Sequence, residues 1–160
     1  MIVGLSHPAI VVPDLEQARQ FYEEMFGFVV ISQEAWEFPN PEYDKGVGLV
    51  DSAARGYIMQ GVNCYLELWE YTSPTPIGQP AMLGANDYGY RHLAFEVDDV
   101  HLELERLQRL GGKVMNTPVK YPHGSNAIYA RDPFGNIVEL MEAGPNFPTL
   151  CDLVPARAPL

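Results

Sequence analysis

Four residues of this chain combine metal-binding side chains with positions inside apolar stretches. His7, Glu67, His92 and Glu139 fall one in each quarter of the sequence, and each interrupts a short run of β-strand composition. Two imidazoles and two carboxylates suit a divalent cation, and strands can hold such ligands rigidly. The pattern therefore predicts a metal site built from four strands.

Each of these residues also has a simpler interpretation, as a solvent-facing residue of an amphipathic strand. A carboxylate on a concave, partly buried face of a sheet is costly unless it is paired or bound to a metal ion. The joint pattern of two histidines and two glutamates, rather than any one of them, favours the metal site.

Composition restricts the classes of protein. A chain of 160 residues fits one medium domain or two half-size modules that share a sheet. Its 47% hydrophobic and 19% charged residues are ordinary for a soluble globular protein. The net charge of −11, without any basic cluster, argues against nucleic acid and anionic membranes as partners.

The spacing of the cysteines and the N-terminal sequence bear on where in the cell the protein is located. Cys64 and Cys151 lie far apart and lack CxxC spacing, which predicts neither a disulfide framework nor a thiolate zinc site. No signal-peptide pattern and no apolar run of membrane-spanning length occurs. We therefore expect a cytoplasmic protein.

The elements that must position the four residues follow the same order twice. In the first half, Asp14 and Gly27 delimit a helix with apolar residues at helical spacing. The expected elements there are a strand at residues 2–12, the helix at 15–26, and strands at 28–36, 56–60 and 62–71. In the second half they are a strand at 91–97, a helix at 100–110, and strands at 113–119, 125–130 and 137–141. Both halves read βαβββ, and a linker rich in Pro and Gly at residues 72–90 separates them.

Three motifs resemble the vicinal oxygen chelate superfamily, which includes glyoxalase I, methylmalonyl-CoA epimerase, extradiol dioxygenases, fosfomycin-resistance transferases and bleomycin-binding proteins. They are Asp14-Leu15 with Phe21-Tyr22 and Phe26-Gly27-Phe28, then Gly89 followed by HLAFEVDDV at residues 92–100, and finally DPFGNIVEL at residues 132–140. The resemblance implies an α+β fold in which two βαβββ modules form a cup-shaped mixed sheet around a metal ion, usually in a homodimer. It implies one glyoxalase-like domain at residues 1–145, with modules at 1–72 and 88–145, and a C-terminal tail at 146–160.

The superfamily's metal positions correspond to His7, Glu67, His92 and Glu139. This ligand set is similar to that of bacterial glyoxalase I, whereas the epimerase commonly has Gln at the position of Glu67. Bleomycin-binding members have usually lost the ligands. Because this chain has all four, an enzyme is favoured over a protein that only sequesters a ligand.

Such a ligand set neutralises a divalent ion and leaves two octahedral positions for a small substrate with adjacent oxygens. The metal, whether Zn, Ni, Co, Mn or Fe, would stabilise the enolate formed when a carbon-bound proton is removed. As the resemblance to glyoxalase suggests, Glu67 or Glu139 could detach and act as the base. We expect a metal-dependent isomerase, epimerase or lyase. The alternatives are a ligand-sequestering, resistance-type binding protein of the same fold and an Fe(II) extradiol-type dioxygenase, although a fourth protein ligand reduces the open positions that the latter needs.

Strand alternation indicates which residues share the face of Glu67 and so bind substrate. They are Asn63, Tyr65, Trp69 and Tyr71, which would line an aromatic cavity or, alternatively, pack against a helix. Trp36 lies in an insertion at residues 34–51 that could be a lid or a surface loop. His123, on a loop, could be a second acid or base, or simply exposed.

Two positions separate the chain from glyoxalases that act on glutathione. The glyoxalases that it resembles carry Arg four residues after the first ligand and Asn four residues after the second, where this chain has Val11 and Tyr71. Without them the carboxylates of glutathione would be left unpaired. We therefore expect an aromatic, cyclic or otherwise less charged substrate.

Overall fold

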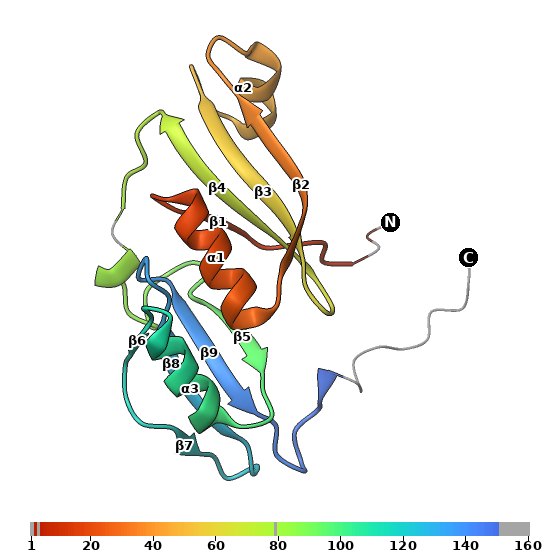
Figure 1. The fold of residues 1–160 in the computed structure, drawn as a ribbon, viewed down its shortest axis with the longest axis vertical. Coiled ribbons are helices and arrows are strands. Elements are labelled where there is room, and N and C mark those ends of the chain that lie inside the picture. Colours follow the sequence, from red (N-terminus) through yellow and green to blue (C-terminus); the bar gives the residue numbers. More distant parts are fainter. Residues whose placement is uncertain (1, 3, 79, 151–160) are drawn as a thin grey trace, which may run out of the picture. The chain divides into compact units, whose positions relative to one another are not determined.

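A computed structural model describes residues 2, 4–78 and 80–150, which fall into two compact units (Figure 1). The boundary follows Gly78, inside the stretch expected to be a linker. Each unit is a βαβββ-like module with one mixed sheet, which confirms the predicted α+β class. Residues 151–160 of the predicted tail lie outside the described residues.

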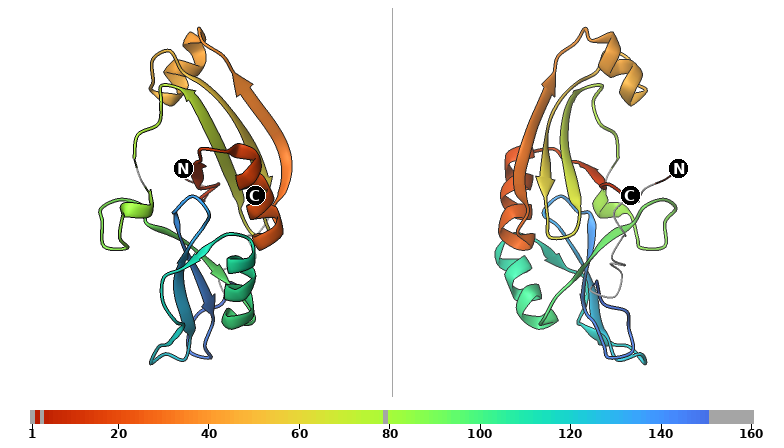
Figure 2. Two further views of the ribbon diagram at one scale, coloured as in Figure 1. Left: turned by 60° about the vertical axis from the view of Figure 1, so that its left-hand side comes forward. Right: turned by 90° about the vertical axis from the view of Figure 1, so that its right-hand side faces the viewer.

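The first unit forms a four-stranded sheet of order β1-β4-β3-β2, in which only β1 and β4 are parallel. Its elements are β1 (Ala9–Val11), α1 (Leu15–Phe26), β2 (Val29–Trp36), α2 (Pro41–Val47), β3 (Ala53–Gln60) and β4 (Tyr65–Ser73). Helix α1 packs on β3 and β4 (Figure 2). As predicted, the Asp14 side chain caps the start of α1, and Gly27 ends it in the left-handed conformation. The stripe that α1 buries consists of Leu15, Ala18, Phe21, Tyr22 and Met25.

The second unit repeats this plan with the order β5-β9-β8-β6, and β7 also pairs with β8. Its elements are η1 (Pro80–Met82), β5 (His92–Glu96), α3 (Val100–Arg109), β6 (Lys113–Val114), β7 (Val119–Lys120), β8 (Asn126–Arg131) and β9 (Ile137–Glu142). Strands β5 and β9 are parallel, and α3 buries Val100, Leu104 and Leu107. Among the described residues, no helix is both long and apolar enough to cross a membrane.

Proline and turn geometry correct several predicted strand limits. The first strand begins at Ala9 rather than residue 2, because Pro8 has no N–H to donate to a ladder, so His7 lies before the strand. The predicted strand at 113–119 is instead β6 and β7, because Pro118 interrupts the pairing with β8 in the same way. Asn63 lies in the turn before β4, which Gly61 closes by donating its N–H to the Cys64 carbonyl.

A short helix, α2, is present in the insertion at residues 34–51, where a lid or a surface loop was expected. Asn40 caps its start and Gly48 ends it in the left-handed conformation. The Asp44 side chain accepts hydrogen bonds from the backbone N–H groups of Asp51 and Ser52. These bonds tie α2 to the chain that leads into β3.

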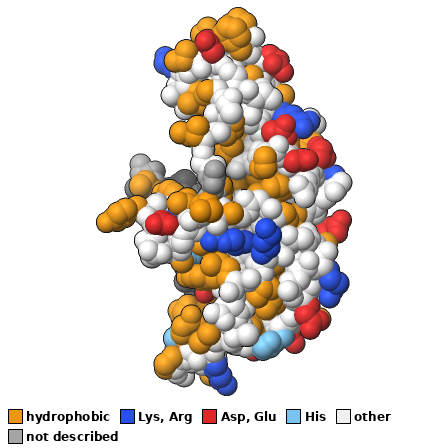
Figure 3. Space-filling view, turned by 90° about the vertical axis from the view of Figure 1, so that its left-hand side faces the viewer, with side chains coloured by type: hydrophobic (Ala, Val, Ile, Leu, Met, Phe, Trp, Pro, Cys, Tyr) orange, Lys and Arg blue, Asp and Glu red, His pale blue; other side chains and the backbone are white. Residues whose placement is uncertain are grey.

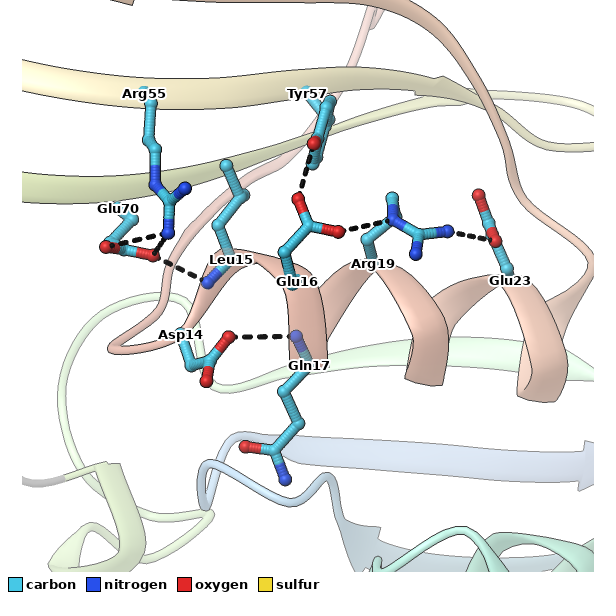
Figure 4. Close-up of polar contacts among 9 residues, drawn as sticks. All are labelled: Asp14, Leu15, Glu16, Gln17, Arg19, Glu23, Arg55, Tyr57 and Glu70. Carbon is cyan, nitrogen blue, oxygen red and sulfur yellow. Dashed lines mark hydrogen bonds and ion pairs between the residues drawn. The ribbon is translucent and has the colours of Figure 1, made fainter.

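A glutamate fixes the start of each long helix to the central strand beneath it. The Leu15 N–H donates to Glu70 at 2.8 Å, and Arg55 pairs with the same carboxylate at 3.0 Å (Figure 4). In the second unit the Val100 N–H donates to Glu142 at 3.4 Å. Both glutamates lie three residues after a candidate ligand, in the repeated pattern Glu-x-x-Glu of β4 and β9. Alternation points the second glutamate of each pattern toward the helix and the first toward the opposite face.

Replacing Glu70 by Ala tests this attachment. The change leaves the Leu15 N–H and the Arg55 guanidinium without their shared acceptor, so we expect the free energy of unfolding to fall by about 1 to 2 kcal/mol. Glu105→Ala, at an exposed position of α3, is the control and should change it by less than about 0.5 kcal/mol. Urea unfolding followed by circular dichroism measures both, and equal effects would contradict the attachment.

Candidate functional site

Glu67 and His7 form the first of two similar pairs. Glu67 lies within β4, and His7 lies two residues before β1, the parallel neighbour of β4. Ala9 is opposite Glu67 in the register, and side chains two residues apart share a face, so His7 and Glu67 meet diagonally. The His7 Nε2 atom is 3.3 Å from Glu67 Oε1, and Ser6 Oγ is 3.0 Å from His7 Nδ1.

His92 and Glu139 form the second pair with the same register. His92 begins β5, Ala94 is opposite Glu139 on the parallel strand β9, and His92 Nε2 is 3.3 Å from Glu139 Oε2. The ring of Tyr129, which is opposite Glu139 on β8, lies 4.9 Å from the His92 ring. Each module thus brings its own His and Glu together.

Both carboxylates are largely buried, whereas the imidazoles reach solvent. The Glu67 and Glu139 side chains are 20% and 18% exposed, against 37% for His7 and 34% for His92. Burial raises the pKa of Glu139, and the neighbouring His92 opposes that shift. Within the described parts of the chain, each glutamate lies beside its histidine, and neither forms an ion pair with Lys or Arg.

The geometry within each pair suits two ligands of one cation. Atoms bound at right angles to an ion at about 2.1 Å lie about 3 Å apart, close to the spacing seen in each pair. Among the described residues, no group of three or more His, Cys, Asp or Glu side chains that could hold a metal gathers. A site of four ligands therefore needs one pair from each unit, from one chain or from two, and it stays a prediction.

Trp69 contacts the first pair directly. Its indole N–H donates to Glu67 Oε2 at 3.0 Å, and this oxygen is not the one that faces His7. The ring lies over Gly56, its partner residue on β3, where an added Cβ would come within 2.3 Å of Trp69 Cε3. Trp69, predicted to bind substrate, therefore also holds a candidate ligand.

Four aromatic rings gather where β2 ends, and Trp36 is at their centre. Its ring stacks on Tyr43 of α2 at 4.6 Å and meets Trp69 and Tyr71 edge to face at 5.3 and 5.8 Å. Trp36 is only 5% exposed, and its indole N–H donates to Ser52. Little of the Trp36 surface is therefore open to a substrate.

Two open pockets lie beside predicted site residues. One, of about 320 Å³, is in the second unit, and its polar lining is Asn116, Thr117, Tyr121, Tyr129 and Glu139. The other, of about 330 Å³, is in the first unit at the turn between β3 and β4, and Asn63 and Tyr65 contribute to it. Neither of these pockets has a Lys or Arg in its lining.

His123 lies in the turn between β7 and β8. Its ring stacks on Tyr121 at 5.4 Å and lies 5.2 Å from the Phe147 ring, and its Nδ1 atom is 3.1 Å from Ser125 Oγ. The side chain is exposed, and the residue lining the pocket of Glu139 from this turn is Tyr121. A role for His123 in binding or catalysis stays a prediction.

Two tyrosines beside Glu139 were missed by the sequence patterns. Tyr121 and Tyr129 line the pocket, and burial, followed by the charge of Glu139, raises the pKa of Tyr129. The pairing of β8 with β9 places Tyr129 opposite Glu139, and the turn between β7 and β8 places Tyr121. No local pattern signals either arrangement.

Known proteins resemble the chain over most of its length. A probable lactoylglutathione lyase of Synechocystis sp. is 28% identical over 142 residues, which cover 86% of this chain and 94% of the relative. A 2-epi-5-epi-valiolone epimerase of Actinomyces sp. is 31% identical over 149 residues, which cover 87% and 79%.

Solved structures share the fold. A glyoxalase family protein from Bacillus cereus has a TM-score of 0.80 at 22% identity, covering 89% of this chain and 95% of that one. The fosfomycin resistance protein FosX of Listeria monocytogenes, in complex with Mn(II) and a sulfate ion, has a TM-score of 0.55 at 23% identity, covering 96% and 98%.

The family model described as Glyoxalase/Bleomycin resistance protein/Dioxygenase superfamily matches residues 4–140, a span that includes both His–Glu pairs. The matched span covers nearly all of the two βαβββ-like modules, and the relatives above also align over most of the chain. This chain therefore belongs to the glyoxalase/bleomycin resistance protein/dioxygenase superfamily.

Proposed function

We propose that the chain is a divalent-metal-dependent isomerase, epimerase or lyase that acts on a small molecule with adjacent oxygens. The observation that carries the proposal is the repeat of a His–Glu pair, with the same register and the same 3.3 Å N–O distance, in both modules. A metal ion would supply the positive charge that two largely buried carboxylates require. The lyase and the epimerase among the relatives support this reaction class.

In this proposal His7, Glu67, His92 and Glu139 hold the ion. When bound, it would act as a Lewis acid that stabilises the enolate left by removal of a carbon-bound proton. Either glutamate could accept that proton. Glu139 is favoured because it lines an open pocket, and because Glu67 already accepts a hydrogen bond from Trp69.

The surroundings of the pairs support a substrate of low charge. The pocket beside Glu139 offers amide, hydroxyl and apolar groups but no Lys or Arg. Val11 and Tyr71 stand where glutathione-dependent relatives were expected to carry Arg and Asn. Binding glutathione would therefore remove water from its carboxylates without providing a cation in return. We propose that the substrate is a neutral hydroxy-carbonyl compound and not a glutathione adduct.

The metal content of the protein and the metal affinity of two variants test the ligand set. We expect freshly purified protein to hold about one divalent ion per chain, measured by elemental analysis and chelator titration. Glu139→Gln should weaken binding about tenfold or more, because it removes a charge while keeping the shape of the side chain. Glu142→Gln removes a charge from the opposite face of the same strand and should leave affinity unchanged. Absence of a tight site in the wild-type protein would refute the proposal.

Solvent exchange tests the chemistry and the substrate class. The metal-loaded enzyme should incorporate deuterium from D₂O at the acidic carbon of its neutral substrate, which NMR detects directly, because proton removal precedes isomerisation. We expect little or no turnover of the hemithioacetal of glutathione and methylglyoxal. Efficient turnover of that adduct would overturn the substrate argument. Oxygen consumption without deuterium exchange would indicate a dioxygenase. Binding of the compound without any reaction would indicate a sequestering protein.

We also propose that the modules pair into one glyoxalase-like domain and that the protein is a homodimer. The edge strand β2 leaves Val29 and Ile31 more than half exposed, and hydrophobic side chains lie exposed in several places in Figure 3. A small sheet covered by one helix still has an open face to bury. Sedimentation velocity should therefore give twice the chain mass, and a single 17.9 kDa species at micromolar concentration would contradict the dimer.

A further inference from the structure

We propose that Trp69 is a positioning residue that fixes the Glu67 carboxylate for metal binding, an inference that rests on the proposed function. The indole N–H donates to Glu67 Oε2 at 3.0 Å, while Oε1 lies 3.3 Å from His7 Nε2. The two oxygens of one carboxylate thus have different partners. An indole nitrogen can only donate, so it orients the carboxylate without competing with it for a cation.

The indole is itself fixed by its neighbours. Gly56 lies beneath the ring, and a Cβ at this position would come within 2.3 Å of Trp69 Cε3 and 2.7 Å of the Leu68 carbonyl. The Trp36 ring meets Trp69 edge to face, with 5.3 Å between centroids. A glycine inside a strand often marks a close approach of this kind, and here it leaves room for the indole that bonds Glu67.

The position that corresponds to Trp69 in the second module has no donor. Met141 follows Glu139 by two residues, as Trp69 follows Glu67, and a thioether has no N–H to donate. Trp69 therefore makes the two carboxylates unequal. Glu67 is held in one orientation, and Glu139 lacks this restraint.

The chain contains two tryptophans, which provide a matched pair of variants. Trp69→Phe keeps an aromatic ring over Gly56 but removes the N–H bonded to Glu67. Trp36→Phe removes the other indole N–H, which is bonded to the buried Ser52. Zinc affinity of the full-length wild type and both variants is measured by competition with a chromophoric chelator. We expect Trp69→Phe to weaken zinc binding about tenfold or more. Trp36→Phe should weaken it much less, because Phe keeps a ring against Trp69 and the hydrogen bond from Trp69 to Glu67 remains.

The indole N–H signals in a ¹H–¹⁵N NMR spectrum provide a readout that a purely structural role would not move. Each Trp→Phe variant loses one indole N–H signal, which assigns the two signals to Trp36 and Trp69. The Trp69 signal should shift in Glu67→Gln, whose side chain is a weaker acceptor, whereas the Trp36 signal should not. If Trp69→Phe fails to fold, this comparison in folded Glu67→Gln protein decides the question.

The outcomes separate the two proposals. Equal zinc affinity of the wild type and Trp69→Phe, or a Trp69 signal that does not respond to Glu67→Gln, would overturn the positioning role and leave the proposed function standing. Failure of the wild-type protein to bind zinc or any other divalent ion would instead refute the proposed function, and the positioning role with it.

Discussion

A largely buried carboxylate needs positive charge beside it, and this requirement applies twice in the chain. Glu67 and Glu139 each face one imidazole at 3.3 Å, and neither has an ion pair with Lys or Arg among the described residues. An imidazole supplies positive charge only when it is protonated, so beside a neutral histidine the negative charge of the glutamate is not balanced. A divalent ion meets the requirement while the histidines stay neutral, which is the form that binds metal. The proposed chemistry follows from this electrostatic constraint.

The two-residue repeat of β4 and β9 lets one strand support both the site and the core. In β4, Leu66 and Leu68 are fully buried, and Glu70 holds the start of α1, while Glu67 and Trp69 occupy the other face. A shift of the register by one residue would exchange these faces, placing leucines in the site and carboxylates under the helix. The attachment of each helix to its central strand therefore also protects the position of the candidate ligand.

Proteins that share this fold are named for different substrates, so the residues around the site bear on substrate choice more than the fold does. This chain has a His–Glu pair in each module, but Val11, Tyr71 and the lining of the pocket beside Glu139 offer no cationic partner for an anionic substrate. One relative is named for lactoylglutathione and another for 2-epi-5-epi-valiolone, so related chains act on different compounds. The fold alone does not decide between them.

Local patterns in the sequence were sufficient to predict the βαβββ order and both long helices, whereas the fold class came from the resemblance to a known superfamily. Asp14 and Gly27 delimit α1 because helix capping and the left-handed conformation depend on neighbouring residues. Strand limits were less predictable, since the sequence alone did not show that pairing stops at Pro8 and Pro118.

The sequence by itself determined the four candidate ligands, their residue types and the face that each shares with its neighbours. Only the tertiary structure decided that His7 meets Glu67, that His92 meets Glu139 and that the Trp69 ring lies over Gly56. These contacts depend on the register between strands that are far apart in the chain. Alternation assigns a side chain to a face of its strand, but the partner across the sheet is set by long-range pairing, which no local pattern encodes.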